Sequence, residues 1–350
     1  MKAPQFRALV LAAGFGTRLR PLTLAMPKPL LPVAGLPVLG HTLFALRKAG
    51  CEAVAVNLHY LGEKIASRFG SEFDGMPIRY SREDEILGTL GALGPLREFL
   101  SESDFAVVLN GDSLAHWPVT RLLKHHREQR PAATLMVSSK APVDEFGGGI
   151  GISREGQVVT FENADENPGA VPDEHSAEDR RRVFAGAHVF SPDLLDDLPD
   201  PPADLVRDLY QPLVERSERI DAVESSELWF DIGTARRYLE GVIGWTGRSG
   251  LRRRGWWAPE AEVDASASVR RSVIEAGAAV RAQARVRRAL VMSGASIGAN
   301  SRVTGSIIGP SVSLPAGTVV DNRLVTEARA DTPPDDRASV VGGLVYGPLE

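Results

Sequence analysis

LVLAAGFGTRLRPLT (residues 9–23) joins an apolar run to a glycine-rich turn. An apolar run typical of a buried strand ends at Gly14-Phe15-Gly16, and Arg18 follows the second glycine closely. The next stretch, AMPKPLLPVAGLPVLG (25–40), carries Lys28 between two prolines. Glycines let the backbone turn its N–H groups onto a phosphate, while arginine and lysine supply fixed positive charge. This turn therefore predicts a polyphosphate site, although it lacks both the third glycine of a dinucleotide fingerprint and a Gly-Lys-Ser/Thr phosphate loop.

Composition narrows the class of protein. The 350 residues are 43% hydrophobic and 24% charged, which allows a sizeable core and predicts two domains. A formal net charge of -5 argues against a general nucleic-acid binder. Cys51 is the only cysteine, which excludes disulfides within the chain and Cys-based zinc sites. No apolar run approaches the roughly 18 residues of a membrane span, and no cleavage-type segment follows the first apolar stretch, so we expect a cytoplasmic protein.

Strand-like and helix-like patterns alternate in the first 140 residues. We expect buried strands at 6–13, 51–58, 77–83, 104–112 and 132–139, and helices at 37–50 and 119–129. Such alternation implies a mostly parallel sheet with helices on both faces, in which ligands collect at the carboxyl ends of the strands. The glycine turn and Asn110-Gly111-Asp112 should therefore lie at one edge. Further along, we expect a helix at 205–215 and a helix capped by Thr234.

The last third of the chain repeats itself. Residues 272–288, 289–305 and 306–322 align without gaps as blocks of 17 residues, with Val273, Leu290 and Ile307 at one position. Other positions of the block are also aliphatic or small throughout. Aliphatic residues at nearly six-residue spacing are typical of a triangular parallel β-helix, in which coils stack about 4.8 Å apart.

Several motifs together resemble a known family. GTRLRPLT…PKPLLPV resembles the signature of the sugar-1-phosphate nucleotidyltransferases, or NDP-sugar pyrophosphorylases. EILGTLGAL (85–93), LNGD (109–112), FAGAHVFSP (184–192) and WFDIGT (229–234) follow in the family's order. The resemblance is closest to mannose-1-phosphate guanylyltransferase-like members. It implies an α/β fold with these parts: a Rossmann-like, mixed but mostly parallel nucleotidyltransferase domain (1–245), a linker (246–254), a left-handed parallel β-helix of hexapeptide repeats (255–325) and a tail (326–350).

The resemblance also implies a reaction. A sugar-1-phosphate oxygen attacks the α-phosphorus of a nucleoside triphosphate, and pyrophosphate leaves. The phosphate monoester is already a nucleophile, so alignment and charge neutralisation suffice without a general base. The implied catalytic residues are Arg18, Lys28, Asp112 and Asp231, of which the two aspartates would share Mg²⁺. The implied nucleotide-binding residues are Leu11, Ala12, Gly14, Gly16, Thr17, Arg18, Glu85, Gly88, Thr89 and Asp112. Those implied for the sugar phosphate are Asn110, Gly148, Glu162, Asn163 and Gly186.

Some interpretations stay open from the residues. Asp112 could instead cap a turn, and Asp231 could stand at the entry of a helix. Many family members carry a Glu-Lys-Pro segment whose lysine holds the sugar phosphate, but here Glu162 is followed by Asn163. All six lysines lie at or before Lys140. The arginines at 180–182 could supply the missing charge or belong to a solvated loop.

The substrates and the role of the repeats are also expectations. The resemblance favours GTP with a mannose- or heptose-like 1-phosphate, with UTP or dTTP and another hexose or a muramic-type phosphate as alternatives. A catalytically silent regulatory subunit is a second alternative. None of the seven histidines lies in the repeats, which argues against acyl transfer in the β-helix. We therefore expect the β-helix to be structural, regulatory or oligomerising, and we expect a homo-oligomer formed through it. We expect no nucleic-acid or membrane partner.

Overall fold

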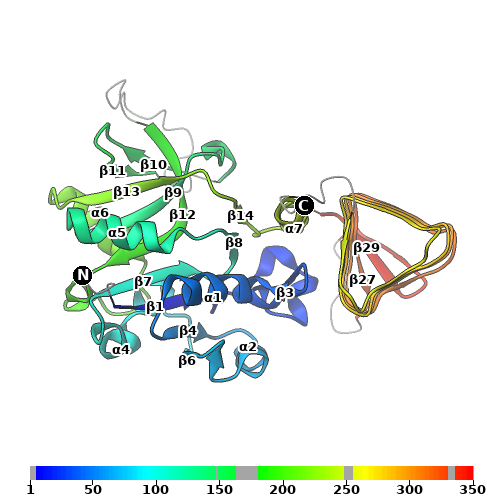
Figure 1. The fold of residues 1–350 in the computed structure, drawn as a ribbon, viewed down its shortest axis with the longest axis horizontal. Coiled ribbons are helices and arrows are strands. Elements are labelled where there is room, and N and C mark those ends of the chain that lie inside the picture. Colours follow the sequence, from blue (N-terminus) through cyan, green and yellow to red (C-terminus); the bar gives the residue numbers. More distant parts are fainter. Residues whose placement is uncertain (1–4, 147–148, 163–179, 248–254, 330–335, 350) are drawn as a thin grey trace. The chain divides into compact units, whose positions relative to one another are not determined.

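The structure is a computed structural model, and it describes residues 5–146, 149–162, 180–247, 255–329 and 336–349 (Figure 1). The chain divides into two compact units that both draw on distant parts of the sequence. The first unit is Met1–Gly14 with Leu39–Trp229, and the second is Phe15–Val38 with Phe230–Glu350. The segment that follows the first strand therefore folds with the C-terminal part of the chain.

The first unit is a mixed sheet with helices. Its strands are β1 (Phe6–Leu11), β4 (Val54–Leu58), β5 (Glu72–Phe73), β6 (Met76–Arg82), β7 (Phe105–Asn110), β8 (Ser113–Ala115), β9 (Ala133–Ser138), β10 (Ile150–Ile152), β11 (Val158–Phe161), β12 (Arg180–Phe190) and β13 (Ile220–Ser225). Its helices are α1 (Val38–Ala49, whose first residue belongs to the second unit), α2 (Gly62–Phe69), α3 (Gly88–Gly91), α4 (Arg97–Ser101), α5 (Val119–Gln129) and α6 (Gln211–Glu215). Short helical turns occupy Gly94–Leu96, Val143–Glu145, Pro192–Leu195 and Val206–Tyr210.

The sheet is parallel at its centre and antiparallel at one side. Its strand order is β11-β10-β12-β7-β1-β4-β6-β5, and β9 joins β12 to β13. Strand β1 pairs in parallel with both β4 and β7, whereas β12 runs antiparallel to β7 and β9. The five expected strands and both expected helices are confirmed, with ends within a few residues of the prediction. Strand β4 is buried along its whole length, as expected for a central strand covered on both faces.

The second unit contains a parallel β-helix, whose triangular coil is seen end-on in Figure 1. Its first face is the strand stack β15 (Trp256–Trp257), β18 (Val273–Ile274), β21 (Leu290–Val291), β24 (Ile307–Ile308) and β27 (Leu324–Glu327). The second face consists of β16 (Glu262–Val263), β19 (Ala279–Val280), β22 (Ser296–Ile297) and β25 (Ser313–Leu314). The third face consists of β17 (Ser268–Arg270), β20 (Arg285–Arg287), β23 (Arg302–Thr304) and β26 (Val319–Asp321). The hairpin β28 (Ser339–Val341) and β29 (Leu344–Gly347) pairs with β27.

The coils keep the register that the sequence predicts. Val273 pairs with Leu290, and Leu290 with Ile307, so each step along the stack is one repeat of the sequence. The inward residues at the other faces, such as Val280 and Ile297, pair in the same way and are buried. The predicted β-helix is therefore confirmed.

The rest of the second unit consists of short elements from two parts of the chain. It contains the hairpin β2 (Pro32–Val33) and β3 (Leu36–Pro37), the end of β14 (Trp229–Asp231) and α7 (Ala235–Thr246), with short helical turns at Thr17–Leu19, Leu22–Leu24 and Lys28–Leu30. Thr234 caps α7 as predicted, because its side-chain oxygen accepts a hydrogen bond from the backbone N–H of Arg237. Among the described residues, no helix has the length and apolar character needed to cross a membrane.

Candidate functional site

The first unit brings three predicted residues together at the end of its central strands. Leu11, the last residue of β1, pairs with Asn110, the last residue of β7. Gly111 then donates its backbone N–H to the Leu11 carbonyl at 2.9 Å, and a Cβ on Gly111 would lie 2.7 Å from that oxygen. Gly186, with φ of +77°, packs so closely on Asn110 that a Cβ would lie 2.4 Å from its amide nitrogen. Only glycine fits either position.

Asp112 follows directly in the turn between β7 and β8, where it is partly exposed. Ala12 and Gly14 lie in the segment that leaves β1, Ala12 buried and Gly14 exposed. Predicted site residues thus follow the carboxyl ends of both β1 and β7, as expected for an open α/β sheet.

A buried polar network supports this edge and was missed in the sequence. The side-chain oxygen of Asn57, at the end of β4, accepts a hydrogen bond from the Ala12 N–H at 2.7 Å. The amide group of Asn57 donates to Glu83 Oε1 at 2.7 Å, and Glu83 Oε2 accepts from the Leu87 N–H at 3.1 Å. Both side chains are buried. The network joins the turn after β1 to the segment that carries the predicted Glu85, Gly88 and Thr89, and its only sequence signal is a polar residue at each strand end.

The predicted segment near Gly88 is held by backbone contacts to Ala203. Gly88 has φ of +80°, and a Cβ there would lie 2.3 Å from the Ala203 carbonyl oxygen. The Thr89 hydroxyl donates to Asp204 Oδ2 at 2.9 Å and accepts from the Leu205 N–H at 2.8 Å. Thr89 therefore shapes this segment through its hydroxyl, whereas Glu85 is exposed to solvent.

The second unit holds the glycine turn and the predicted lysine. Gly16 has φ of +63°, and its carbonyl accepts a hydrogen bond from the Thr23 hydroxyl at 2.8 Å. A Cβ on Gly16 would lie 3.1 Å from Thr23 Cγ2 and 3.4 Å from Lys28 Cβ, so the turn packs directly on the Lys28 segment. The side chains of Thr17 and Arg18 are exposed on the following helical turn.

Lys28 and Arg18 both lie close to Asp231. Lys28 Nζ, on a side chain that is only 7% exposed, lies 3.9 Å from Asp231 Oδ1. A Cβ at Gly233 would lie 3.1 Å from Arg18 Nη2 and within 3.0–3.1 Å of both carboxylate oxygens of Asp231. Three of the four predicted catalytic residues are therefore neighbours within the second unit.

Arg237 is a further cation that sequence reasoning missed. Its Nη1 donates to Asp231 Oδ2 at 2.6 Å from the first turn of α7. Gly233 was missed as well, although it stands in the WFDIGT motif and leaves the space that Arg18 and Asp231 share. Asp231 is thus one carboxylate among three cationic side chains, an arrangement suited to an anionic ligand such as a phosphate.

The donor set also fits a hard divalent cation. Mg²⁺ is usually held by one or two carboxylates together with substrate phosphates and water. Asp231 directs one oxygen to Arg237 and has Lys28 at the longer distance of 3.9 Å, and its side chain is 20% exposed. No group of three or more His, Cys, Asp or Glu side chains suited to a metal occurs in the described ranges. The residues therefore fit an ion that substrate phosphates help to hold, not one caged by protein alone.

On the predicted sugar-phosphate side, Glu162 forms an ion pair. Both its carboxylate oxygens accept hydrogen bonds from Arg181 Nε, at 3.0 and 2.8 Å, and Arg181 Nη2 also contacts Oε2. This hydrogen bonding to Glu162 raises the pKa of Arg181 above its already high value. Gly148 and Asn163, predicted for the same side, lie outside the described residues.

The three arginines at 180–182 are strand residues, so their interpretation as a solvated loop is wrong. They form the start of β12 and pair with β10, with Ile150 opposite Arg182. Arg180 and Arg182 both make ion pairs with Glu224, at 2.6 and 3.0 Å. Their alternation along the strand places these two on the same face and Arg181 on the other.

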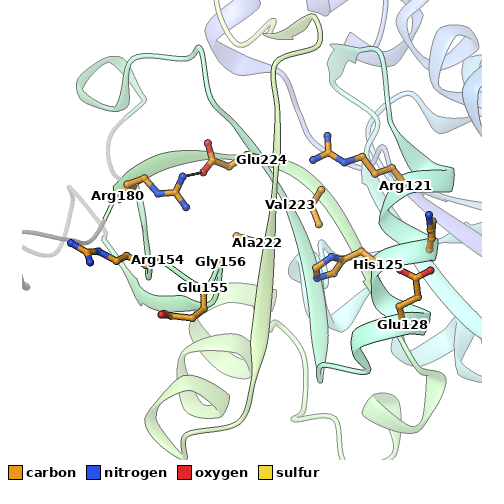
Figure 2. Close-up of a pocket in the computed structure, with 11 residues that line it drawn as sticks. Arg121, His125, Glu128, Arg154, Glu155, Gly156, Arg180, Ala222, Val223 and Glu224 are labelled. Atoms are coloured by element: carbon orange, nitrogen blue, oxygen red, sulfur yellow. Dashed lines mark ion pairs between the residues drawn. The ribbon is translucent and has the colours of Figure 1, made fainter.

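Arg180 and Glu224 also line a polar groove on the first unit (Figure 2). Helix α5, the turn between β10 and β11, and strand β13 surround it, and Figure 2 shows Arg180 paired with Glu224 at its border. None of the predicted site residues lines this groove. We therefore do not assign the candidate active site to it.

Comparisons with known proteins agree with the two parts of the chain. A family model described as nucleotidyl transferase matches residues 7–244, and one described as GlmU-like, C-terminal hexapeptide matches residues 258–332. The mannose-1-phosphate guanylyltransferase catalytic subunit beta of Drosophila pseudoobscura pseudoobscura is 31% identical over 239 residues, which are 67% of this chain and 61% of that protein. The UTP–glucose-1-phosphate uridylyltransferase of Synechocystis is 34% identical over 254 residues, 68% of this chain and 63% of that protein.

The two relatives match only part of either chain, whereas a solved structure is matched over its whole length. The chain spans about three fifths of the length of the curated relatives it matches. The crystal structure of HddC from Yersinia pseudotuberculosis matches with a TM-score of 0.57 and 18% identity, covering 69% of this chain and all of that one, so it supports the fold. Because the nucleotidyl transferase model matches residues 7–244, which are more than half of the chain, the chain belongs to the nucleotidyl transferase family.

Proposed function

We propose that this chain transfers a nucleoside monophosphate from a nucleoside triphosphate to a sugar-1-phosphate and releases pyrophosphate. The observation that carries the proposal is the grouping of Lys28, Arg18 and Asp231 within a chain that matches the nucleotidyl transferase model. The reaction moves negative charge between phosphate oxygens, so cations fixed before the reaction stabilise its transition state. A silent regulatory subunit would not need to keep these groups.

The roles follow from the position of each group. Gly14, Gly16, Thr17 and Arg18 would bind the triphosphate, and Lys28 would face the α-phosphate and the sugar phosphate. Asp112 and Asp231 would hold Mg²⁺, which would neutralise charge on the triphosphate when bound. Lys28 is enclosed by the packed glycine turn, so its ammonium has little freedom to move away from the reacting phosphate. A positive charge held in place stabilises the transition state more than a mobile charge does.

For substrates we propose GTP with mannose-1-phosphate or a heptose-1-phosphate. The similarity to the fly relative, a mannose-1-phosphate guanylyltransferase catalytic subunit, supports this choice. UTP with a hexose-1-phosphate is the second candidate, because a uridylyltransferase is 34% identical to this chain. The alternatives with dTTP or a muramic-type phosphate stay predictions from the sequence alone.

The missing lysine leaves the sugar phosphate without its usual partner, and we propose that Arg181 supplies this charge. Glu162 already orients its guanidinium at the start of β12. An arginine can bind a phosphate oxygen and a carboxylate at once, since it has five donors. Replacing Arg181 by alanine should raise the KM for the sugar phosphate more than the KM for the nucleotide.

The test is a matrix of each NTP with a panel of sugar-1-phosphates in the presence of Mg²⁺, followed by pyrophosphate release. Turnover with one pair identifies the substrates, and its loss with EDTA and return with Mg²⁺ supports the metal. An Asp112→Asn variant serves as the inactive reference. No turnover with any pair would instead favour the silent regulatory subunit.

A further inference from the structure

The second coil of the β-helix contains a buried carboxylate that the coil does not need. Glu275 directly follows β18 and is 1% exposed. One repeat further the same position holds Met292, and one repeat beyond that Gly309. All three donate their backbone N–H groups to the next coil in the same way. The coil therefore forms equally well with an apolar residue or none, so the acid at 275 requires another explanation.

Glu275 binds the tip of the β2–β3 hairpin. Its Oε2 accepts a hydrogen bond from the Gly35 N–H at 2.9 Å, and the Ala34 N–H also contributes a hydrogen bond. Ala34 and Gly35 have φ values of 52° and 85°, so they form the tight turn between Val33 and Leu36. A Cβ on Gly35 would lie 3.3 Å from the ring of Trp256, which places the turn directly on the first coil.

The other end of this hairpin continues into the Lys28 segment. The Pro32 carbonyl accepts a hydrogen bond from the Tyr238 hydroxyl at 2.6 Å, and Tyr238 is completely buried on α7. The neighbouring Arg237 on α7 binds Asp231, which lies 3.9 Å from Lys28 Nζ. Within the second unit, Lys28 is therefore linked through Asp231 to α7, and α7 is linked through the hairpin to the β-helix.

We propose that Glu275 is a positioning residue, which fixes the β2–β3 turn on the β-helix and thereby holds the Lys28 segment in place beside Asp231. The expected effect on catalysis rests on the proposed function, whereas the contact between Glu275 and the turn is independent of it. Burial costs a carboxylate free energy, and Glu275 Oε1 has no hydrogen-bond partner among the described residues. Burial also raises the pKa of Glu275, while its hydrogen bonds from Gly35 and Ala34 act in the opposite direction. What Glu275 contributes is the acceptor for the backbone N–H groups of Gly35 and Ala34.

The experiment compares Glu275→Ala and Glu275→Gln with the wild-type full chain. Glu262→Ala is the matched control, because Glu262 lies on another face of the same β-helix, is 71% exposed and forms an ion pair with Arg281. Hydrogen exchange of peptides spanning residues 28–38 reports the turn, and kcat and KM for the nucleotide report catalysis. Thermal unfolding shows whether each variant is folded.

We expect Glu275→Ala to accelerate exchange at Ala34 and Gly35 on the order of tenfold, the effect of losing a hydrogen bond to a charged group. It should lower kcat several-fold with little change in the nucleotide KM, because the Lys28 segment loses its fixed position rather than its charge. Glu275→Gln keeps an oxygen acceptor for the turn, so its exchange rate and its kcat should both stay close to the wild-type values. Glu262→Ala should leave exchange and kcat at the wild-type level.

Each result decides one part of the inference. Unchanged exchange at residues 28–38 in a folded Glu275→Ala chain would overturn the contact. Faster exchange with unchanged kcat would overturn its link to catalysis. If Glu275→Ala does not fold, the same comparison is made with Glu275→Gln and Glu275→Asp, the shorter of which should be the more defective. A wild-type chain without turnover would contradict the proposed function, while its exchange would still test the contact.

Discussion

Lys28 Nζ lies 3.9 Å from Asp231 Oδ1, while Asp231 Oδ2 accepts a hydrogen bond from Arg237 at 2.6 Å. The closer pair joins two residues that are near in sequence, whereas Lys28 comes from the far N-terminal part of the chain. Lys28 and Arg237 thus reach the same carboxylate from distant parts of the sequence, and Asp231 lies between the two cations.

The first prediction concerns the charge of Asp231. Asp231→Asn keeps an oxygen for Arg237 but removes the negative charge that orients the cations and would bind a metal. We expect turnover to fall by about 100-fold or more, the typical effect of losing one preorganised electrostatic group. The thermal unfolding temperature should change little, because asparagine has nearly the shape of aspartate and keeps an oxygen acceptor for Arg237. Asp74→Asn, at an exposed pair with Arg47, is the control and should keep full turnover.

Lys28 carries the second prediction. Lys28→Met preserves most of the packing of this buried stem but removes its charge, which would act on the reacting phosphate. We expect kcat to fall much more than nucleotide affinity, the pattern of an interaction made mainly in the transition state. Steady-state kinetics and nucleotide titration measure the two separately, and the exposed Lys48→Met serves as the control. Equal losses in kcat and affinity would assign Lys28 to ground-state binding instead.

Repeated features of the fold could be predicted from the sequence. The inward aliphatic residues of the β-helix recur at each block, so the alignment of Val273, Leu290 and Ile307 is enough to predict the register of the coils. Single contacts between distant residues leave no such pattern. The hydrogen bonds of Asn57 with Ala12 and of Glu275 with Gly35 each occur once, so neither could be found. The arginines at 180–182 were misread for a related reason, since three consecutive charges do not have the alternation of a strand.

The Asn57 network gives a third prediction. Asn57→Ala removes the acceptor of the buried Ala12 N–H and the Asn57 donor to Glu83 Oε1. Leaving buried polar groups unpaired should lower the free energy of unfolding by about 1–3 kcal/mol and loosen the turn that follows β1. Denaturant unfolding and the KM for the nucleotide measure these two effects. The partly exposed Ser81 on the neighbouring strand β6 provides a control as Ser81→Ala, and equal effects at both sites would contradict the role of the network.

A fourth prediction tests the β-helix core. Ile297→Asp places a charge inside a coil at a fully buried position, which should cost at least about 3 kcal/mol of unfolding free energy. Val319→Asp introduces the same group in the same β-helix at a side chain that is 68% exposed, and it should cost little. Denaturant unfolding of both variants makes the comparison. A small effect at Ile297 would mean that its side chain does not face the core.

The last prediction concerns the pH dependence of stability. Burial lowers the pKa of His126 to about 4, with a smaller contribution from the neighbouring His125, so the folded chain holds a neutral imidazole. The unfolded chain takes up a proton below about pH 6.5, so stability should be lost as the pH falls from about 6.5 towards 4. At pH 5 the loss from one such group is about 2 kcal/mol.

Replacing His126 by a residue that cannot take up the proton tests this coupling. His126→Asn keeps a polar atom near the Thr134 hydroxyl, which lies 2.9 Å from Nδ1. Denaturant unfolding between pH 7 and pH 5 should therefore show a shallower pH dependence for this variant than for the wild type. His116→Asn, at a side chain that is 42% exposed, is the matched control. If both variants follow the wild-type curve, His126 is not the group that couples folding to proton uptake.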